Sequence, residues 1–217
     1  LKPGTLVSYE TTLPVGTTRN RFAPMLEEVS NLKAGKDFNL VFSPERVFTG
    51  RVFADLRKYP KLVGGINDAS TEAGVKFYEQ VLEFDKREDL ARPNGVWNLG
   101  TSEASELAKL AETTYRDVNI GLANQFAQFA ASNGIDVYAV IEACNSQPFS
   151  HIHQPGIAVG GHCIPVDPTY LAAVAEEYGA PATFIRRANE VNLEMSKYVV
   201  DRVQADNGGS LQGKRVL

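Results

Sequence analysis

The residues with the clearest potential for chemistry lie in the segment GIAVGGHCIPVDPTYL, residues 156–171. Its cysteine, Cys163, is one of two in the chain and follows the glycines Gly160 and Gly161. Glycine permits unusual backbone angles and, because it has no side chain, lets another molecule approach the loop closely. This composition makes Cys163 a candidate nucleophile that a ligand can reach.

The residues after Cys163 predict the start of a helix. Asp167 followed by Pro168 is a typical pair, with the aspartate as the cap and the proline at the first helical position. A thiol just ahead of a helix N-terminus lies near the positive end of the helix dipole, which favours the thiolate. The alternative is that Cys163 is a small buried residue and Asp167 only a cap, and the spacing alone leaves both open.

The other cysteine and the histidines indicate no second centre of chemistry. Cys144 stands in VIEACNS, a helical segment with aliphatic residues and no glycine, so we expect it in the core. His151, His153 and His162 lie close to Cys163 in sequence, but their spacing matches no common zinc pattern and no second ligand pair is evident. The sequence therefore predicts no metal site.

Three further polar side chains occupy positions that suit ligand binding. Thr12 in ETTLPVGTT lies at the end of a predicted strand and Glu45 in SPER follows one, and open α/β sheets bind ligands at the carboxyl ends of their strands. Lys109 lies on a predicted helix, on a face that it shares with Thr113 and Arg116 and away from the apolar stripe. Each has an ordinary alternative, such as a turn carboxylate for Glu45 and a solvated lysine for Lys109.

Residues 1–100 alternate strands with helices. Runs rich in apolar and β-branched residues predict strands at residues 5–12, 61–65 and 95–101, and a further strand that begins at residue 38 and runs into a turn at Ser43-Pro44. Helical spacing predicts helices over residues 21–32 and over residues 68–82, the second capped by Asp68 or Ser70. The apolar side of the second helix comprises Val75, Phe77, Tyr78, Val81 and Leu82. This alternation predicts βαβ units, a mostly parallel sheet and the α/β fold class.

From residue 101 the pattern becomes helical. No proline interrupts residues 102–132, which predicts one long helix of roughly 45 Å at about 1.5 Å per residue. Its predicted apolar stripe comprises Leu107, Leu110, Ala111, Thr114, Val118, Leu122, Phe126 and Phe129. Further helices are predicted over residues 136–145, 169–178 and 181–204, the last with Phe184, Ala188, Val191, Met195, Val199 and Val203 on its apolar side. Long apolar helices often pair with copies of themselves, so we expect a homodimer formed through them.

Composition argues against several classes of protein. The net charge is −4 and no basic stripe appears, so we expect no nucleic-acid partner. No apolar run approaches the roughly 18 residues of a membrane span, and no secretory signal is visible. Two cysteines without a disulfide pattern favour a reducing compartment, so we expect a cytoplasmic protein. Leu1 is not a methionine, and residues 213–217 read as the start of a strand, so we expect part of a longer polypeptide.

Four motifs, in the same order along the chain, resemble motifs of the UDP-glucose/GDP-mannose dehydrogenase family. They are ETTLPVGTT, FSPERVFTGR, ELAKLAETTYRDVNIGLANQFA and GGHCIPVDPTYL, and they are distributed over residues 10–171, most of the length of the chain. HCIPVDP and YRDVNI resemble the branch that acts on UDP-N-acetylhexosamines, such as UDP-N-acetylmannosamine, more than the UDP-glucose branch. The resemblance implies an NAD-dependent enzyme that oxidises the C6 alcohol of the sugar to a carboxylate.

The resemblance also implies roles for individual residues. Cys163 is the nucleophile beside the cofactor, and it captures the intermediate aldehyde first as a thiohemiacetal and then as a thioester. Lys109 places positive charge where oxyanions develop, and Thr12 lies beside the nicotinamide. Asp167 and Glu45 position water or transfer protons. The residues that the resemblance assigns to binding of the UDP-sugar are Glu45, Arg46, Lys109, Thr113, Gln154, Gly160 and Gly161.

By the same resemblance the chain divides into three parts. Residues 1–100 are the second half of a Rossmann-type NAD-binding domain, residues 101–207 an all-α central dimerisation domain, and residues 208–217 the start of a UDP-binding domain. The G-x-G-x-x-G fingerprint of NAD-binding domains is absent from the sequence. We therefore expect the chain alone to be inactive and the full protein to be active.

The sequence departs from the family pattern in two places. Thr113 stands where the family has asparagine, and Ile157 and Ala158 stand where another glycine or proline is expected. A non-catalytic dimerisation module and a UDP-glucose 6-dehydrogenase remain alternatives. The β-hydroxyacid and 6-phosphogluconate dehydrogenases share the long helix with its lysine, but they need no cysteine loop, so GGHC argues against them.

Overall fold

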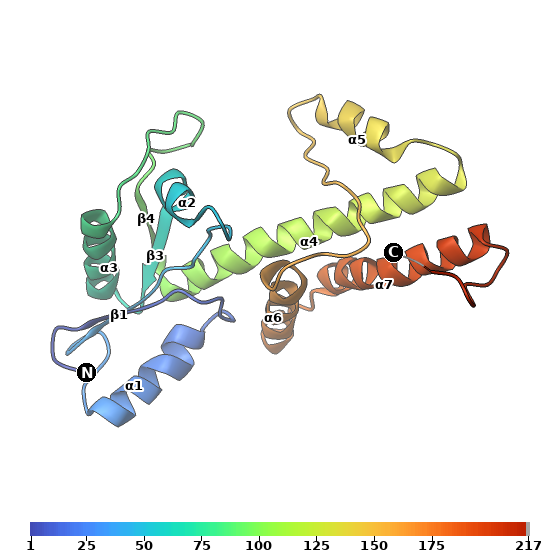
Figure 1. Cartoon of the computed structure of the whole chain (residues 1–217). Helices are drawn as coiled ribbons and strands as arrows, with labels where there is room; N and C mark the ends of the chain where they lie inside the picture. Colours follow the sequence, from blue (N-terminus) through green and yellow to red (C-terminus); the bar gives the residue numbers. More distant parts are fainter. Residues whose placement is uncertain (216–217) are drawn as a thin grey trace. The chain divides into compact units, whose positions relative to one another are not determined.

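The computed structural model of the chain describes residues 1–215 and forms two compact units, Leu1–Ala111 and Glu112–Leu217. The boundary falls inside a single helix, α4 (Ser102–Ser132), whose first turns belong to the first unit (Figure 1). Within residues 1–215, no helix is long and apolar enough to cross a membrane. Each unit is described by itself below.

The first unit is built on a four-stranded sheet with strand order β1-β2-β3-β4. The strands are β1 (Leu6–Tyr9), β2 (Asn39–Phe42), β3 (Lys61–Gly65) and β4 (Val96–Thr101). β1 pairs with β2 and β3 with β4 in parallel, whereas β2 and β3 run antiparallel. The prediction of an α/β fold with a mostly parallel sheet is confirmed, and the antiparallel pair places the start of β3 beside the carboxyl end of β2.

Two helices cover opposite faces of this sheet, because neighbouring residues of a strand point to opposite sides. Leu40 packs in a cluster with Ala23 of α1 (Ala23–Ser30), and Val41 packs in a cluster with Tyr78 of α3 (Asp68–Val81). The predicted cap of α3, Asp68 or Ser70, is wrong. The cap is Asn67, whose side chain accepts a hydrogen bond from the backbone N–H of Ser70.

Some features of the first unit differ from the sequence prediction. Phe77 and Val81 of α3 are 43% and 54% exposed, so only part of the predicted apolar side is core. Two short elements were not predicted, the π-helical turn η1 (Thr18–Phe22) and the helix α2 (Val52–Lys58). Both lie in segments whose apolar residues show no sustained period, and tertiary contacts decide their conformation.

The helix α4 confirms the predicted single long helix, but the predicted apolar stripe is largely on the wrong face. Leu107, Leu122 and Phe129 are 45%, 45% and 68% exposed. The buried positions are instead mostly polar: Ser102, Ser105, Glu106, Lys109, Thr113, Thr114, Asp117 and Asn124. Hydrophobicity alone cannot reveal this face, because its larger polar residues, Glu106, Lys109, Asp117 and Asn124, are stabilised by specific hydrogen-bond partners rather than by apolar contacts.

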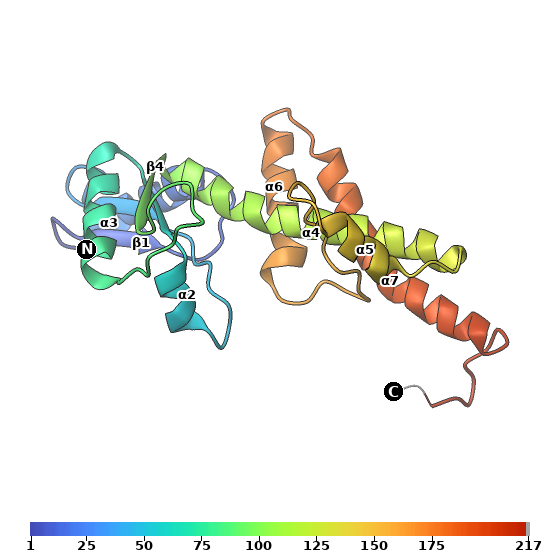
Figure 2. The same ribbon diagram turned by 90° about the horizontal axis from the view of Figure 1, so that it is seen from above.

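The second unit contains the rest of α4 with α5 (Val137–Asn145), α6 (Cys163–Glu177) and α7 (Thr183–Asp206). One core cluster comprises Ala123, Ala130, Val137 and Ile141. Helices α6 and α7 pack on each other, as both views show (Figure 1 and Figure 2). Helices α4 and α7 approach closely at Gly121, where an added Cβ atom would lie 2.9 Å from the carbonyl oxygen of Ala188.

Three expectations for the second unit need correction. The helix expected at residues 169–178 begins instead at Cys163, because Pro165 in its first turn needs no N–H partner and Pro168 removes only one hydrogen bond. Phe184, predicted on the apolar side of α7, is 73% exposed. The strand expected at residues 213–217 is not formed by residues 213–215, and the remaining two positions lie outside the described residues.

The sheet core gives a first prediction. Val41 is fully buried, so Val41→Ala is expected to lower the free energy of unfolding of the first unit by about 2 kcal/mol through the cavity that it leaves. Val29 on α1 is 79% exposed, and the matched change Val29→Ala should cost less than about 0.5 kcal/mol. Urea unfolding followed by circular dichroism measures both losses, and equal losses would contradict this assignment of the core.

Candidate active site

Two carboxylates follow the parallel strands β1 and β2. The backbone N–H of Glu45 donates to the carbonyl oxygen of Glu10 over 3.0 Å, so the segments after the two strands stay side by side. The Nζ of Lys109 donates to the carbonyl oxygen of Glu45 over 3.0 Å, and Lys109 is only 7% exposed. The first unit therefore brings Lys109 and Glu45 together, and the alternative of a solvated lysine is wrong.

A second buried lysine completes this group of charges. The Nζ of Lys61 lies 3.4 Å from Glu10 Oε2 and 3.7 Å from Glu45 Oε2, and Lys61 is 6% exposed. The ammonium also lies 4.9 Å from the ring centroid of Tyr78 and donates to the carbonyl oxygen of Ser43. Sequence analysis missed Lys61, since the start of a parallel β3 would lie at the opposite edge of the sheet.

The phenol of Tyr78 belongs to the same group. Burial, followed by the hydrogen bond that its hydroxyl donates to Glu10, raises the pKa of Tyr78 well above its usual value. The neutral hydroxyl also shares a hydrogen bond of 2.8 Å with the hydroxyl of Ser8. Glu10 is thus held by a neutral donor on one side and by an ammonium on the other.

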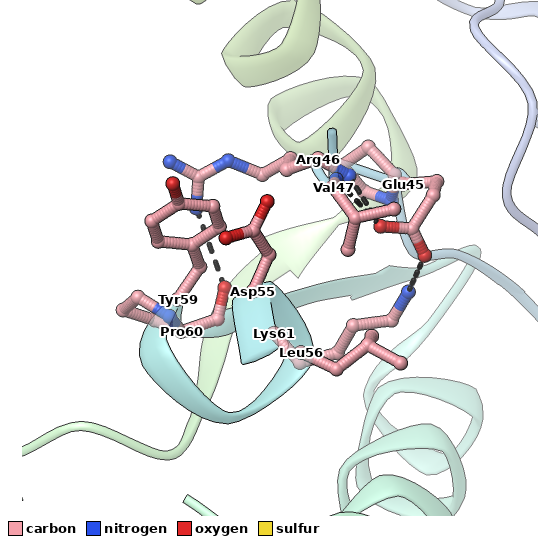
Figure 3. Close-up of a pocket in the computed structure, with 9 residues that line it drawn as sticks. Glu45, Arg46, Val47, Asp55, Leu56, Tyr59, Pro60 and Lys61 are labelled. Carbon is pink, nitrogen blue, oxygen red and sulfur yellow. Dashed lines mark hydrogen bonds and ion pairs between the residues drawn. The ribbon is translucent and has the colours of Figure 1, made fainter. Parts of the chain in front are cut away.

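The carboxylate of Glu45 has a fixed direction (Figure 3). Its Oε1 accepts the backbone N–H groups of Arg46 and Val47 over 2.6 and 2.9 Å, while Oε2 faces Lys61. The guanidinium of Arg46 donates to the carbonyl oxygen of Pro60 over 3.3 Å. These residues line a recess of about 10 Å³, room for about one water molecule. Glu45 and Arg46 therefore lie on one surface feature of the first unit.

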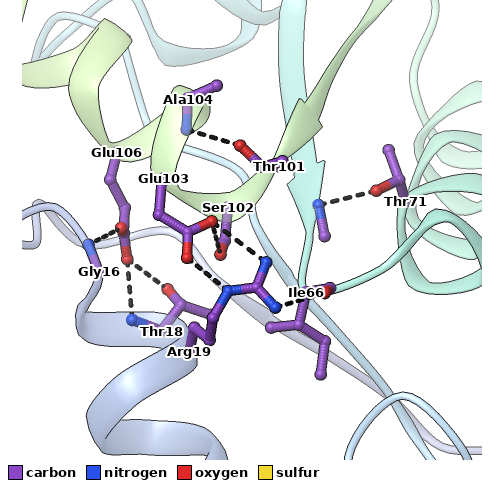
Figure 4. A network of polar contacts seen from close by, with 11 residues as sticks. Gly16, Thr18, Arg19, Ile66, Thr71, Thr101, Ser102, Glu103, Ala104 and Glu106 are labelled. Atoms are coloured by element: carbon purple, nitrogen blue, oxygen red, sulfur yellow. Dashed lines mark hydrogen bonds and ion pairs between the residues drawn. The ribbon is translucent and has the colours of Figure 1, made fainter.

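The loop that carries Thr12 is tied to α4 by a buried carboxylate (Figure 4). Glu106 accepts the backbone N–H of Gly16 over 2.5 Å and both the N–H and the hydroxyl of Thr18 over 2.8 and 2.7 Å. Gly16 has a φ of +87°, a conformation that favours glycine. Burial raises the pKa of Glu106, against the effect of these donors. Thr12 itself is half-buried just beyond β1.

In the second unit, Cys163 is the first residue of α6 and is exposed. Gly160 and Gly161 are open, since an added Cβ atom at either would meet nothing within 4 Å. Asp167 lies one helical turn after Cys163 and is 2% exposed, so it is an interior residue of α6 and the predicted cap role is wrong. The thiol stands at the N-terminal end of a 15-residue helix, beside a stretch of backbone that a ligand can approach.

The second unit also contains three other residues that the sequence analysis named. Cys144 is exposed, so its predicted place in the core is wrong; the core cluster stops at Ile141, one turn earlier on α5. Thr113 is fully buried on α4, and Gln154 is exposed in the loop before Cys163. Among residues 1–215, no three His, Cys, Asp or Glu side chains are grouped to hold a metal ion.

Asparagine side chains hold the loop that leads to Cys163. The side-chain oxygen of Asn119 accepts the N–H of His153 over 2.9 Å, and its amide donates to the carbonyl oxygen of His151 over 2.7 Å. Asn145 makes the same reciprocal pair with Ile152, at 2.8 Å in each direction. Amide side chains can satisfy a backbone donor and acceptor together, so this irregular segment has a defined path.

Comparison with known proteins identifies the fold and these motifs. Residues 1–82 match the model of the UDP-glucose/GDP-mannose dehydrogenase family, NAD binding domain, and residues 103–194 match the model of the central domain of that family. The chain belongs to the UDP-glucose/GDP-mannose dehydrogenase family. The resemblance of its motifs to this family is thereby confirmed.

Members of this family with known names include close relatives of the chain. A UDP-N-acetyl-D-mannosamine dehydrogenase of Pyrococcus horikoshii is 39% identical over 187 residues, which are 86% of this chain and 42% of the relative. A structure of the UDP-D-ManNAc dehydrogenase from that organism has a TM-score of 0.83 at 34% identity, covering 95% of this chain and 47% of the other. The structure of an NDP-N-acetyl-D-galactosaminuronic acid dehydrogenase from Methanosarcina mazei Go1 has a TM-score of 0.81 at 33% identity, covering 94% of this chain and 43% of the other. The chain thus spans less than half the length of these family members.

His153 gives a prediction on pH dependence. Burial, and then the charge of Arg116, lower the pKa of His153 below 6.5, and within residues 1–215 its Nε2 has no hydrogen-bond partner. The unfolded chain therefore binds the proton at a higher pH than the folded chain, and the stability of the second unit should fall as the pH drops below about 6.5. Thermal unfolding between about pH 7.5 and about pH 5.5 measures this fall.

The control for this prediction is the neighbouring histidine. His153→Phe keeps a ring beside Tyr115, from which His153 is 6.2 Å away between centroids, and should reduce the fall in melting temperature. His151 is exposed, and His151→Phe should leave the fall as in the wild type. A fall of the same size in both variants would assign the effect to other groups.

Proposed function

We propose that the protein is an NAD-dependent dehydrogenase that oxidises the C6 alcohol of a UDP-N-acetylhexosamine, UDP-N-acetylmannosamine in the first instance, to the carboxylate. The observation that carries the proposal is the exposed thiol of Cys163 at the first residue of α6, preceded by a glycine-opened backbone. An alcohol-to-carboxylate oxidation needs a group that retains the aldehyde between its two oxidation steps, and a cysteine thiolate can form that bond.

Thr12 of the first unit would lie beside the nicotinamide end of the cofactor. Thr12 follows a strand end of a domain that matches the family's NAD-binding model, and its hydroxyl suits a nicotinamide neighbour. The phosphate-binding G-x-G-x-x-G turn does not occur in the 217 residues. NAD, when bound, supplies the acceptor for the hydrides that leave the sugar carbon, two per sugar.

Cys163 would act on the aldehyde. Its thiolate adds to the aldehyde carbon and gives a thiohemiacetal, which is again an alcohol with a hydrogen on carbon. Oxidation of this adduct gives a thioester, and water then releases the carboxylate and restores the thiol. The position at the first residue of α6 supports the role, because the exposed sulfur is accessible to the aldehyde carbon.

The charged group of the first unit would manage oxyanions and protons. Lys109 supplies a buried ammonium, which is the group expected where alkoxide or tetrahedral oxyanions develop. Glu45, whose Oε1 is held by two backbone N–H groups, would position water or take a proton. The ammonium of Lys61 lies 3.7 Å from Glu45 Oε2 and would help to hold the carboxylate in place.

The remaining roles follow the family motifs. Asp167 would orient water or transfer a proton from its buried position on α6, and Arg46 and Thr113 would contact the UDP-sugar. The largely exposed segment from Gln154 to Gly161 would hold the nucleotide-sugar through its backbone. Thr113 offers one hydroxyl where an asparagine amide would offer a separate donor and acceptor.

The names of the relatives support an N-acetylhexosamine rather than glucose. Both the Pyrococcus and the Methanosarcina proteins are named for N-acetylated sugars, and each is at least 33% identical to the chain. Their names differ in the sugar, so the configuration at the sugar carbons is a separate question. UDP-glucose 6-dehydrogenase and a non-catalytic dimerisation module are the competing functions that the experiment below separates.

The test compares the rate of NADH formation between the wild type and a variant at Cys163. In a polypeptide of the relatives' full length that contains this chain, NADH formation with UDP-N-acetylmannosamine should fall at least about 1,000-fold in Cys163→Ser, since a serine hydroxyl is far less nucleophilic than a thiolate. The matched change at the other exposed cysteine, Cys144→Ser, should leave the rate unchanged. UDP-glucose serves as the comparison substrate and should react more slowly.

Two outcomes would contradict the proposal. An unchanged rate in Cys163→Ser would favour a different chemistry, and no NADH with any UDP-sugar would favour the dimerisation module. The 217-residue chain alone is expected to produce no NADH, because it contains no G-x-G-x-x-G turn.

We further propose a homodimer formed through the long helices, in the cytoplasm. Exposed apolar side chains on α4 and α7 support the dimer: Leu122, Phe126 and Phe129 on α4, and Leu193 and Val200 on α7. The two free, exposed thiols are compatible with a reducing compartment.

The dimer is tested by sedimentation. Phe129 is 68% exposed, and Phe129→Asp should shift the chain from dimer to monomer in sedimentation velocity because it places a charge on the proposed contact. Val29→Asp, on the exposed side of α1, is the matched control and should leave the dimer intact. A monomeric wild type, or a dimer in both variants, would argue against this surface.

A further inference from the structure

Asp117 of α4 is a buried carboxylate that the proposed chemistry does not use. It is fully buried, and both of its oxygens accept hydrogen bonds from side chains of α7. Oδ1 accepts from the amide of Asn192 over 2.8 Å, and Oδ2 accepts from the amide of Asn189 over 3.1 Å. The amide of Asn192 also donates to the backbone carbonyl of Asp117 over 2.8 Å. A buried carboxylate held in this way fixes the orientation of its donors.

One arm of this network runs from Asp117 to the start of the cysteine loop. With its amide N–H₂ bound to Asp117, Asn192 presents its side-chain oxygen to the amide of Asn124 over 2.8 Å. Asn124 in turn presents its oxygen to the backbone N–H of Gly156 over 2.9 Å. Asn124 and Asn192 are 0% and 4% exposed, so water does not compete for the bond between them. The direction of each amide is determined by the one before it.

A second arm runs from Asp117 to the other end of the loop. The amide of Asn189 that donates to Asp117 also donates to the carbonyl oxygen of Pro165 over 3.2 Å. Pro165 lies two residues after Cys163, in the first turn of α6. The two arms therefore bracket residues 156–165, the segment that contains the open glycines and the thiol.

We infer that Asp117 is a positioning residue for Cys163: through Asn192 and Asn124 on one side and Asn189 on the other, one carboxylate fixes both ends of residues 156–165. A carboxylate is required because it accepts at both oxygens, whereas an asparagine at this position would turn an N–H₂ group toward one of the two donors. Gly160 and Gly161 have open surroundings, so the path of this segment depends on its ends. The effect of Asp117 on catalysis rests on the proposed function, whereas its effect on the position of residues 156–165 does not.

Amide hydrogen exchange by NMR on the 217-residue chain tests the network. Asp117→Asn should raise the exchange rate of the Gly156 N–H at least about tenfold, although Asp117 does not touch Gly156, and Asn124→Ala should do the same by direct loss of the acceptor. The Pro165 carbonyl carbon should change its chemical shift in Asp117→Asn and in Asn189→Ala. Asn119→Ala is the matched control: it should speed exchange of the His153 N–H and leave Gly156 as in the wild type.

Asn192→Ala serves if Asp117→Asn does not fold, because Asn192 also acts on Gly156 only through Asn124. Faster exchange of the Gly156 N–H in either variant, with unchanged exchange rates for the amides of α5, supports the network. Unchanged Gly156 exchange in a folded Asp117→Asn or Asn192→Ala protein overturns it.

The effect on catalysis is measured in the full-length enzyme. Asp117→Asn should lower kcat with UDP-N-acetylmannosamine at least about tenfold, with a smaller change in KM for NAD, since only the thiol segment moves. A normal kcat together with fast Gly156 exchange would overturn the role in positioning Cys163. A wild-type enzyme without dehydrogenase activity would refute the proposed function and leave the exchange result standing.

Discussion

The structure depends on one constraint, that the charged groups buried along α4 must have hydrogen-bond partners. Glu106, Lys109 and Asp117 follow one another along this helix, and each is at most 7% exposed. A buried group without partners would cost about 1–3 kcal/mol, and more if it is charged. Their partners come from outside the helix: the loop at Gly16 and Thr18 for Glu106, a backbone carbonyl for Lys109, and asparagines of α7 for Asp117.

These partner segments are also the ones that carry the candidate functional residues. Glu106 holds the loop that follows Thr12, and Lys109 binds the backbone of Glu45. The bonds that satisfy Asp117 lead to both sides of Cys163. The same hydrogen bonds that make α4 stable in its surroundings therefore give defined positions to loops that have few apolar contacts of their own.

The direction of β3 has a comparable effect on the charges of the first unit. Because β3 runs antiparallel to β2, its first residue, Lys61, lies beside the carboxylates that follow β1 and β2. Only the ammonium of Lys61 is buried, and its two half-exposed carboxylate partners offset the unfavourable desolvation of that charge. The hydroxyl of Tyr78, kept neutral by burial, adds a donor to Glu10 without adding charge.

The sequence alone determined the α/β portion, the long helix at residues 102–132 and the motifs that identify the family, since these depend on local period and on residue types in order. It also singled out Cys163, because glycines and prolines constrain the backbone wherever the segment lies. It misplaced Cys144, the start of α6 and the buried face of α4, and it missed Lys61 and Asp117 as organising charges. Those features depend on which distant donor meets which acceptor, and on whether a strand runs parallel or antiparallel, so only the tertiary structure decided them.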